Sequence, residues 1–134
     1  MAFILPVRNV VPAFGKHCFV APNATLSGDV VCGEAVTIWF GAVIRGDVNP
    51  IRIGDQTNIQ DGAIVHGSYD GIPTLIGAQV TVGHRAIIHG CTIHDRVLIG
   101  MGAIVLDEAV VGEGCIVGAG SLVLAGMELE SGYL

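Results

Sequence analysis

Residues 93–123, IHDRVLIGMGAIVLDEAVVGEGCIVGAGSLV, decide the fold, because a branched aliphatic residue returns at every sixth position. A small or β-branched residue lies two positions before each later member of this series. A period of six residues is the signature of a hexapeptide β-helix, in which each hexad contributes one short strand and one turn. The series consists of Ile93, Ile99, Val105, Val111, Val117 and Val123.

The same period extends toward the N-terminus. Three hexads close one triangular coil with the aliphatic and small residues inside, and successive coils stack about 4.8 Å apart. The hexads predict one all-β domain over residues 1–134, with a little under six coils from about residue 20 to 128 and residues 1–19 as a lead-in. A β-sandwich requires alternating apolar residues and turns every roughly 8–12 residues, and the sequence lacks both patterns. The earlier aliphatic positions are Val20, Leu26, Cys32, Ile38, Ile44, Ile53, Ile59, Val65, Ile76, Val82 and Ile88.

The period is interrupted at three places, all near a group of histidines. Three extra residues precede Ile53, five precede Ile76, and one is missing before Ile93. Insertions in a β-helix project as loops on one side, which is often the binding side. We therefore expect two loops beside the histidines.

The composition excludes several classes of function. Six basic and 12 acidic residues give a net charge of −6, and the absence of a basic patch argues against nucleic acid as a partner. No apolar stretch reaches the roughly 18 residues that cross a membrane. The N-terminus lacks the basic segment of a signal peptide, and the four cysteines form no CxxC pair, as in proteins of a reducing compartment. We therefore expect a cytoplasmic protein without a membrane segment.

The register brings two histidines together. His66 and His89 each follow an inward aliphatic residue, and those residues are three hexads apart. The two side chains should therefore occupy the same corner of adjacent coils, at a spacing at which two imidazoles can share one metal. His84 falls at the preceding corner, about 16 Å from His89 along an extended face. His84 is then either idle, or it completes a metal site on a neighbouring chain, for example in a threefold ring.

Charged residues fall in the same two columns. Arg45 lies one coil before His66, and Asp61 lies one coil before His84. If the two columns meet across an interface, Arg45 faces Asp61 beneath a site of three histidines. The alternative is that these are separate solvated side chains at the corners of the β-helix.

Three segments carry a resemblance to a known family: GAVIRGDVNPIRIGDQTNIQDGAIVHG (41–67), TVGHRAIIHGCTI (81–93) and LIGMGAIVLD (98–107). Together they resemble the γ-class carbonic anhydrases. The resemblance implies a left-handed β-helix and a homotrimer with metal sites between subunits. The implied metal is zinc, with iron or cobalt as alternatives. The implied substrates are carbon dioxide and bicarbonate.

The resemblance also implies roles for individual residues. His66 and His89 of one chain and His84 of its neighbour would bind the metal, and Arg45 and Asp61 would form an ion pair between subunits. Three neutral histidines leave zinc one open position. The bound water then has a pKa near 7, and the resulting hydroxide attacks carbon dioxide.

The resemblance also implies residues that surround the metal and residues that carry away the proton of the metal-bound water. The resemblance places Asp47 in the polar network and points Gln60 toward the metal-bound hydroxide. Typical members of the prototype branch carry a glutamate where this chain has Val48, and another glutamate in the loop after the first histidine. Here that loop is GSYDGIP, in which Tyr69 and Asp70 are the candidates for proton transfer.

Two other predictions accompany the resemblance. Members of the family usually continue into a C-terminal helix, whereas this sequence ends at LESGYL, so we expect no such helix. The alternative functions are an acyltransferase or thioesterase of the hexapeptide-repeat class and a non-catalytic trimeric scaffold.

Overall fold

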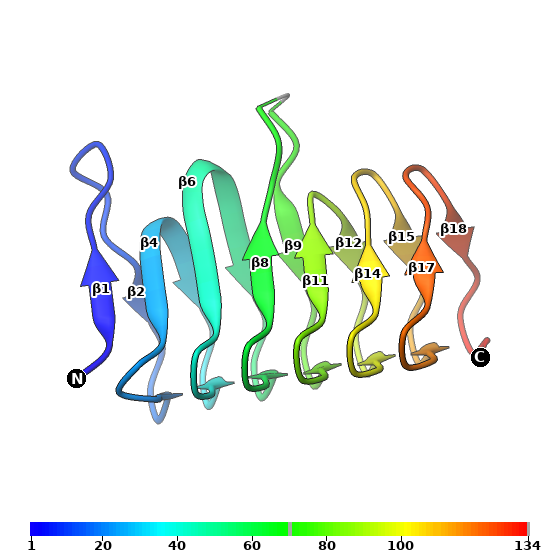
Figure 1. The fold of residues 1–134 in the computed structure, drawn as a ribbon, viewed down its shortest axis with the longest axis horizontal. Helices are drawn as coiled ribbons and strands as arrows, with labels where there is room; N and C mark the ends of the chain where they lie inside the picture. Colours follow the sequence, from blue (N-terminus) through cyan, green and yellow to red (C-terminus); the bar gives the residue numbers. More distant parts are fainter. Residues whose placement is uncertain (70, 134) are drawn as a thin grey trace.

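The fold is a stack of parallel coils. The computed structural model describes residues 1–69 and 71–133, and its regular structure in these residues is β-strand without helix. The coils lie side by side along one axis from the N-terminus to the C-terminus (Figure 1). The strands form a 12-stranded and a 6-stranded sheet, and all paired strands are parallel. The prediction of an all-β hexapeptide-repeat β-helix is confirmed.

Most strands are short because each hexad turns a corner after two or three extended residues, and β4 and β6 are the long exceptions. They are β1 (Phe3–Leu5), β2 (Ala13–Phe14), β3 (Phe19–Val20), β4 (Thr25–Cys32), β5 (Thr37–Ile38), β6 (Val43–Ile53), β7 (Asn58–Ile59), β8 (Ile64–His66), β9 (Thr74–Ile76), β10 (Thr81–Val82), β11 (Ile87–His89), β12 (Thr92–Ile93), β13 (Leu98–Ile99), β14 (Ile104–Val105), β15 (Val110–Val111), β16 (Ile116–Val117), β17 (Leu122–Val123) and β18 (Glu128–Leu129).

The six-residue series forms the core. Ile88 of β11 pairs with Val65 of β8 on one side and Val105 of β14 on the other, and all three side chains have no exposed surface. The small residues two positions earlier are buried as well, for example Ala86 and Ala103. Branched aliphatic residues fill the space between three close sheet faces, while the small residues fit where the chain approaches a corner.

The N-terminal segment differs from the predicted lead-in. Phe3–Leu5 pairs with Thr25–Ser27, and Ala13–Phe14 pairs with Val31–Cys32, so this segment forms a further coil. Ile4 packs against the core without belonging to a six-residue series. The β-helix therefore has about 7 turns rather than a little under six, because backbone pairing to β4 recruits residues that the period does not mark.

Only one of the two insertions projects. The loop between β8 and β9 extends beyond the neighbouring turns (Figure 1). The extra residues before Ile53 instead lie within the continuous strand β6, so the expectation of a loop there was wrong. The reason is that β4 is also long and pairs with β6 along both arms, with a register shift between Gly28 and Val30 that accommodates the extra residues.

In the part of the chain that the structure describes, no helix has the length and apolar character needed to span a membrane.

Cysteine burial gives a first testable prediction. All four cysteines are free thiols, and burial, with a smaller effect of nearby Cys18, raises the pKa of Cys32 to about 12. At pH 8 we expect Cys32 in the native protein to react with a thiol reagent about a thousandfold more slowly than after denaturation, because the thiolate reacts. Mass spectrometry of partly labelled protein identifies each site, with half-buried Cys18 as the internal comparison. Labelling of Cys32 at the rate of Cys18 would contradict the prediction.

Candidate metal site

His66 and His89 lie next to each other at one corner of the β-helix. They end β8 and β11, which pair in register with His66 opposite His89. Their ring centroids are 5.4 Å apart and the rings meet edge to face. The prediction that these histidines occupy the same position on adjacent coils is confirmed.

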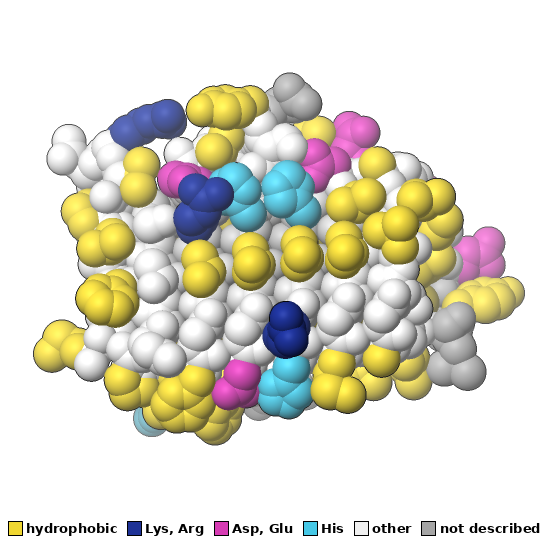
Figure 2. All heavy atoms as spheres, viewed as in Figure 1, with side chains coloured by type: hydrophobic (Ala, Val, Ile, Leu, Met, Phe, Trp, Pro, Cys, Tyr) yellow, Lys and Arg dark blue, Asp and Glu magenta, His cyan; other side chains and the backbone are white. Residues whose placement is uncertain are grey.

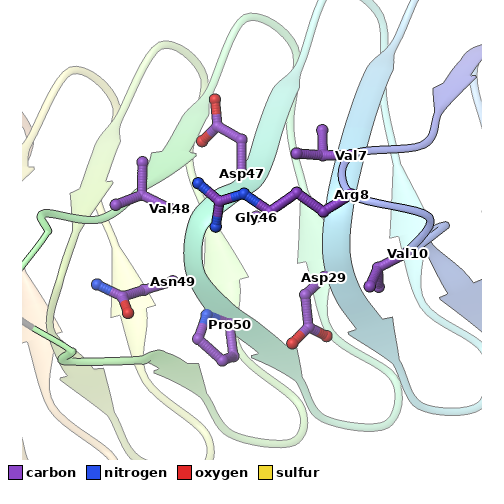
Figure 3. A pocket seen from close by; sticks show the side chains of 9 residues that line it. All are labelled: Val7, Arg8, Val10, Asp29, Gly46, Asp47, Val48, Asn49 and Pro50. Atoms are coloured by element: carbon purple, nitrogen blue, oxygen red, sulfur yellow. The ribbon is translucent and has the colours of Figure 1, made fainter.

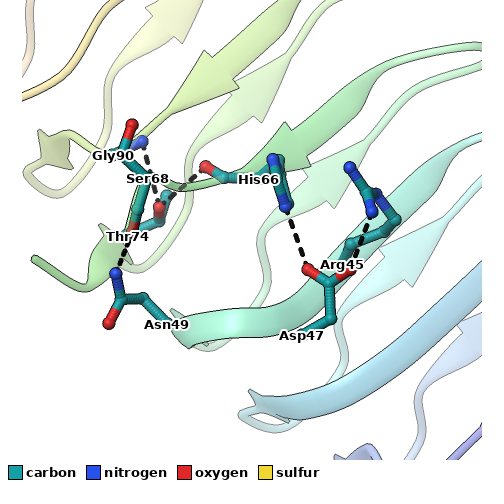
Figure 4. A network of polar contacts seen from close by, with 7 residues as sticks. All are labelled: Arg45, Asp47, Asn49, His66, Ser68, Thr74 and Gly90. Atoms are coloured by element: carbon teal, nitrogen blue, oxygen red, sulfur yellow. Dashed lines mark hydrogen bonds and ion pairs between the residues drawn. The ribbon is translucent and has the colours of Figure 1, made fainter. Parts of the chain in front are cut away.

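A carboxylate contacts His66. Asp47 Oδ1 lies 2.9 Å from His66 Nε2, and Asp47 Oδ2 accepts a hydrogen bond of 2.7 Å from Arg45 Nη1. Figure 4 shows Arg45, Asp47 and His66 in this line of contacts. Within one chain Arg45 thus pairs with Asp47, and its predicted ion pair with Asp61 of a neighbouring subunit stays a prediction.

A second carboxylate contacts His89. Asp107 Oδ1 lies 2.5 Å from His89 Nδ1, and Ser68 Oγ donates a hydrogen bond of 2.5 Å to Asp107 Oδ2. Partial burial acts to raise the pKa of Asp107, but the hydrogen bonds from Ser68 and His89 outweigh it, so the pKa lies below its ordinary value. Asp107 is therefore a carboxylate at neutral pH. Sequence reasoning identified neither Asp107 nor Ser68.

His84 lies at the other corner with a carboxylate of its own. His84 Nδ1 is 3.1 Å from Asp61 Oδ1, and both side chains are about half exposed. The next residue, Arg85, has a φ of 59° at a turn position that is glycine on the coils before and after it, Gly62 and Gly102. The chain thus holds a non-glycine residue in the left-handed region directly beside His84.

Gln60 also belongs to this second corner. It lines a cleft of about 370 Å³ together with Asp61, His84 and Trp39. Gln60 therefore lies with His84, at the corner that the His66–His89 pair does not occupy. A role for Gln60 at the same metal requires the two corners to meet between chains.

A smaller cleft borders Asp47. It measures about 180 Å³ and is formed by the turn before Val10 and by the bend of β6 from Gly46 to Pro50. Figure 3 shows the Arg8 side chain extending across Gly46 toward Asp47. Val48, at the position of a glutamate in the prototype branch, lines this cleft as an apolar wall.

Tyr69 is an exposed residue three positions after His66. It occupies the loop between β8 and β9, its side chain is 84% exposed, and its carbonyl accepts a hydrogen bond from the amide of Gly71. Asp70, the other predicted candidate for proton transfer, lies outside the described residues.

The donor set fits a metal shared between chains. Within residues 1–69 and 71–133, no three His, Cys, Asp or Glu side chains are grouped closely enough to hold a metal ion. Each of the three histidines nevertheless directs one ring nitrogen to an aspartate, and its other ring nitrogen has no partner among the residues that the structure describes. An aspartate on the second ring nitrogen is the usual support of a metal-binding histidine.

Comparison with known proteins places the chain in a family. The family described as "Bacterial transferase hexapeptide (six repeats)" matches residues 90–125. Protein YrdA of Escherichia coli is 48% identical over 135 residues, which cover 96% of this chain and 73% of that protein. The mitochondrial gamma carbonic anhydrase 2 of Arabidopsis thaliana is 50% identical over 134 residues, which cover 96% of this chain and 48% of that protein.

The chain belongs to the γ-carbonic anhydrase family. This member of the γ-carbonic anhydrase family spans about half the length of the plant relatives that it matches. A solved structure of a Bacillus cereus protein, described as a putative acetyltransferase, superimposes with a TM-score of 0.95 at 45% identity and covers 97% of this chain and 75% of that one. The resemblance seen in the sequence is confirmed at the level of family and fold.

Proposed function

We propose that this protein is a metal-dependent γ-carbonic anhydrase that interconverts carbon dioxide and bicarbonate at sites between the subunits of a homotrimer. One observation carries the proposal. Two histidines in register at one corner and a third at the next corner each have one nitrogen on an aspartate and the other without a partner among the described residues. We assign zinc as the metal, with iron or cobalt as alternatives.

The face between the two corners supports assembly from several chains. The outward side chains of Val43, Ile64, Ile87, Ile104 and Leu122 are in register on five strands. Figure 2 shows a row of hydrophobic side chains across this face, with histidines along both of its edges. Ile64 and Leu122 are 40% and 54% exposed in the single chain. A second copy on this face would cover the apolar row and carry its own histidines to the site.

The chain's residues hold the imidazoles in one tautomer and one orientation. Asp47 Oδ1 lies 2.9 Å from one ring nitrogen of His66, and Asp61 Oδ1 lies 3.1 Å from one ring nitrogen of His84. A carboxylate favours N–H on the nitrogen that faces it, so the opposite nitrogen presents a lone pair. Arg45 holds Asp47 in place through a hydrogen bond of 2.7 Å from its guanidinium. A bound zinc ion would lower the pKa of a water molecule so that it attacks carbon dioxide near neutral pH.

Other residues receive substrate or protons. The Gln60 side chain lines the cleft at His84, where its amide can orient carbon dioxide by hydrogen bonding. Hydration releases one proton for each bicarbonate, and this proton must reach bulk water. The exposed Tyr69 hydroxyl stands on the loop after His66, and we assign it the transfer of that proton to solvent.

Metal content and hydration rate test the proposal together. Protein purified without chelator should contain about one zinc, iron or cobalt ion per chain by elemental analysis, because each of three equivalent interfaces holds one site. Stopped-flow assays should then show carbon dioxide hydration that a chelator removes and added metal restores. Absence of metal, even after metal is added to folded protein, would contradict the proposal and favour a trimeric scaffold.

A second candidate is an acyl-transfer or thioester-cleaving enzyme. The family match and the Bacillus cereus structure both carry transferase descriptions. The same metal site could supply hydroxide to a thioester. Release of free thiol from acetyl-coenzyme A at a rate above that of the metal-free protein would support this candidate, and the hydration assay separates the two.

A further inference from the structure

The loop between β8 and β9 is tied to two other coils through Ser68. The amide of Asn49 donates to the Ser68 carbonyl, and the Ser68 hydroxyl donates to Asp107 Oδ2 at 2.5 Å. Asn49 lies in β6 and Asp107 lies just after β14, so Ser68 links residues from two other coils.

The same loop is fixed at its second end by Thr74. Thr74 is fully buried, donates its hydroxyl to the carbonyl of His66 at 3.0 Å and accepts from the amide of Gly90 at 3.1 Å (Figure 4). These hydrogen bonds hold the backbone directly after both histidines of the pair. These hydrogen bonds thus make the loop an integral part of this corner.

The orientation of Asp107 toward His89 depends on the partners of its two oxygens and on the space that Gly90 leaves. Its two oxygens have separate partners, His89 Nδ1 on Oδ1 and Ser68 Oγ on Oδ2. Gly90 makes the approach feasible, because a Cβ atom at Gly90 would lie only 2.5 Å from Asp107 Oδ1. Gly90 also has a φ of 60°, a backbone conformation that favours glycine.

The carboxylate determines which nitrogen of His89 carries the proton. A carboxylate only accepts hydrogen bonds, so the proton of neutral His89 resides on Nδ1 and the lone pair on Nε2. Among the described residues, no other side chain hydrogen-bonds the His89 ring.

We propose that Asp107, held by Ser68, is a positioning residue for His89 that fixes the Nδ1–H tautomer and directs Nε2 to the shared metal. The part concerning metal rests on the proposed function, whereas the part concerning the tautomer does not. Through Ser68, the loop after the first histidine orients the third ligand.

The test compares Asp107→Ala and Ser68→Ala with Glu108→Gln in the full chain. Glu108 is the neighbouring exposed acid, and its side chain has no hydrogen bond to any residue that the structure describes, so Glu108→Gln reports the effect of charge alone. We expect Asp107→Ala to weaken Zn²⁺ affinity about 10- to 100-fold, measured by competition with a chelator. Ser68→Ala should weaken it about three- to tenfold through the loss of one hydrogen bond, and Glu108→Gln should change it less than about twofold.

The ¹⁵N shifts of the His89 ring in chelator-treated protein at pH 8.5 supply a readout that needs no metal. The parent should show the Nδ1–H form, and Asp107→Ala should shift the ring toward the Nε2–H form. An unchanged tautomer together with an affinity equal to that of Glu108→Gln overturns the proposal. A tautomer shift in a protein that binds no Zn²⁺ upholds the positioning of His89 and overturns the metal-dependent function. If Asp107→Ala does not fold, the same measurements on Ser68→Ala test the proposal.

Discussion

Mixing a His84→Ala chain with a His89→Ala chain should restore metal binding, although neither variant binds metal alone. Each proposed site takes His66 and His89 from one chain and His84 from its neighbour. When the two variants are unfolded, mixed in equal amounts and refolded, an intact site forms where a His84→Ala chain supplies the pair and a His89→Ala chain supplies His84. Random assembly gives this arrangement at about a quarter of the sites. The amount of Zn²⁺ bound per chain, after loosely held metal is removed, measures the share of intact sites.

A matched mixture makes the experiment decisive. His66 and His89 lie on the same chain, with their ring centroids 5.4 Å apart. A mixture of His66→Ala with His89→Ala therefore contains no chain with both histidines, and it should bind no metal. Equal recovery in the two mixtures, or recovery in neither, would contradict a site shared between chains. Each single variant should lose more than the roughly 10- to 100-fold in affinity that removal of a supporting partner costs.

Replacement of Ile88 by alanine should lower the free energy of unfolding by about 2–5 kcal/mol. Ile88 has no exposed surface and lies between Val65 and Val105 in the aliphatic column. The removed carbons leave a cavity, because close sheet faces on three sides restrict relaxation. Urea denaturation with metal removed and at a fixed protein concentration measures the change without a contribution from ligand binding and with that of assembly held constant.

Ile116→Ala is the control for this substitution. Ile116 is also on a short strand, but its side chain is 41% exposed and points outward. We expect its loss to change the free energy of unfolding by less than about 1 kcal/mol. Equal losses for the two variants would show that the inward column is not the main source of stability.

The sequence predicts the fold and the histidine pair well because both follow from the six-residue spacing of the aliphatic residues. Each hexad occupies one side of a coil, so Val65 and Ile88 align and carry His66 and His89 with them. The first coil was missed because Phe3–Leu5 joins through backbone pairing to β4, which leaves no six-residue mark. Likewise, the continuity of β6 depends on its long partner β4 rather than on its own residues.

The polar supports of the histidines were only partly predictable. Asp61 and His84 fall in one column by register, and the structure places them in contact. Asp107 lies 18 residues after His89. This coil has only 17 residues, since Ile88 pairs with Val105, so counting places Asp107 one residue beyond the position in register with His89. Ser68 carried no such signal, since it belongs to an insertion whose path is set by its contacts with Asn49 and Asp107.

The stacking of parallel coils also governs which changes in chain length the site can tolerate. His66 and His89 meet because the chain between them completes a single circuit. One additional circuit of about 18 residues inserted there would fit the core but separate the two rings by a further 4.8 Å or so. The same segment inserted after β17 would lengthen the molecule and leave the pair and its partner Asp107 in place. Gene duplications of whole repeats are therefore neutral or fatal for the site according to their position relative to two histidines.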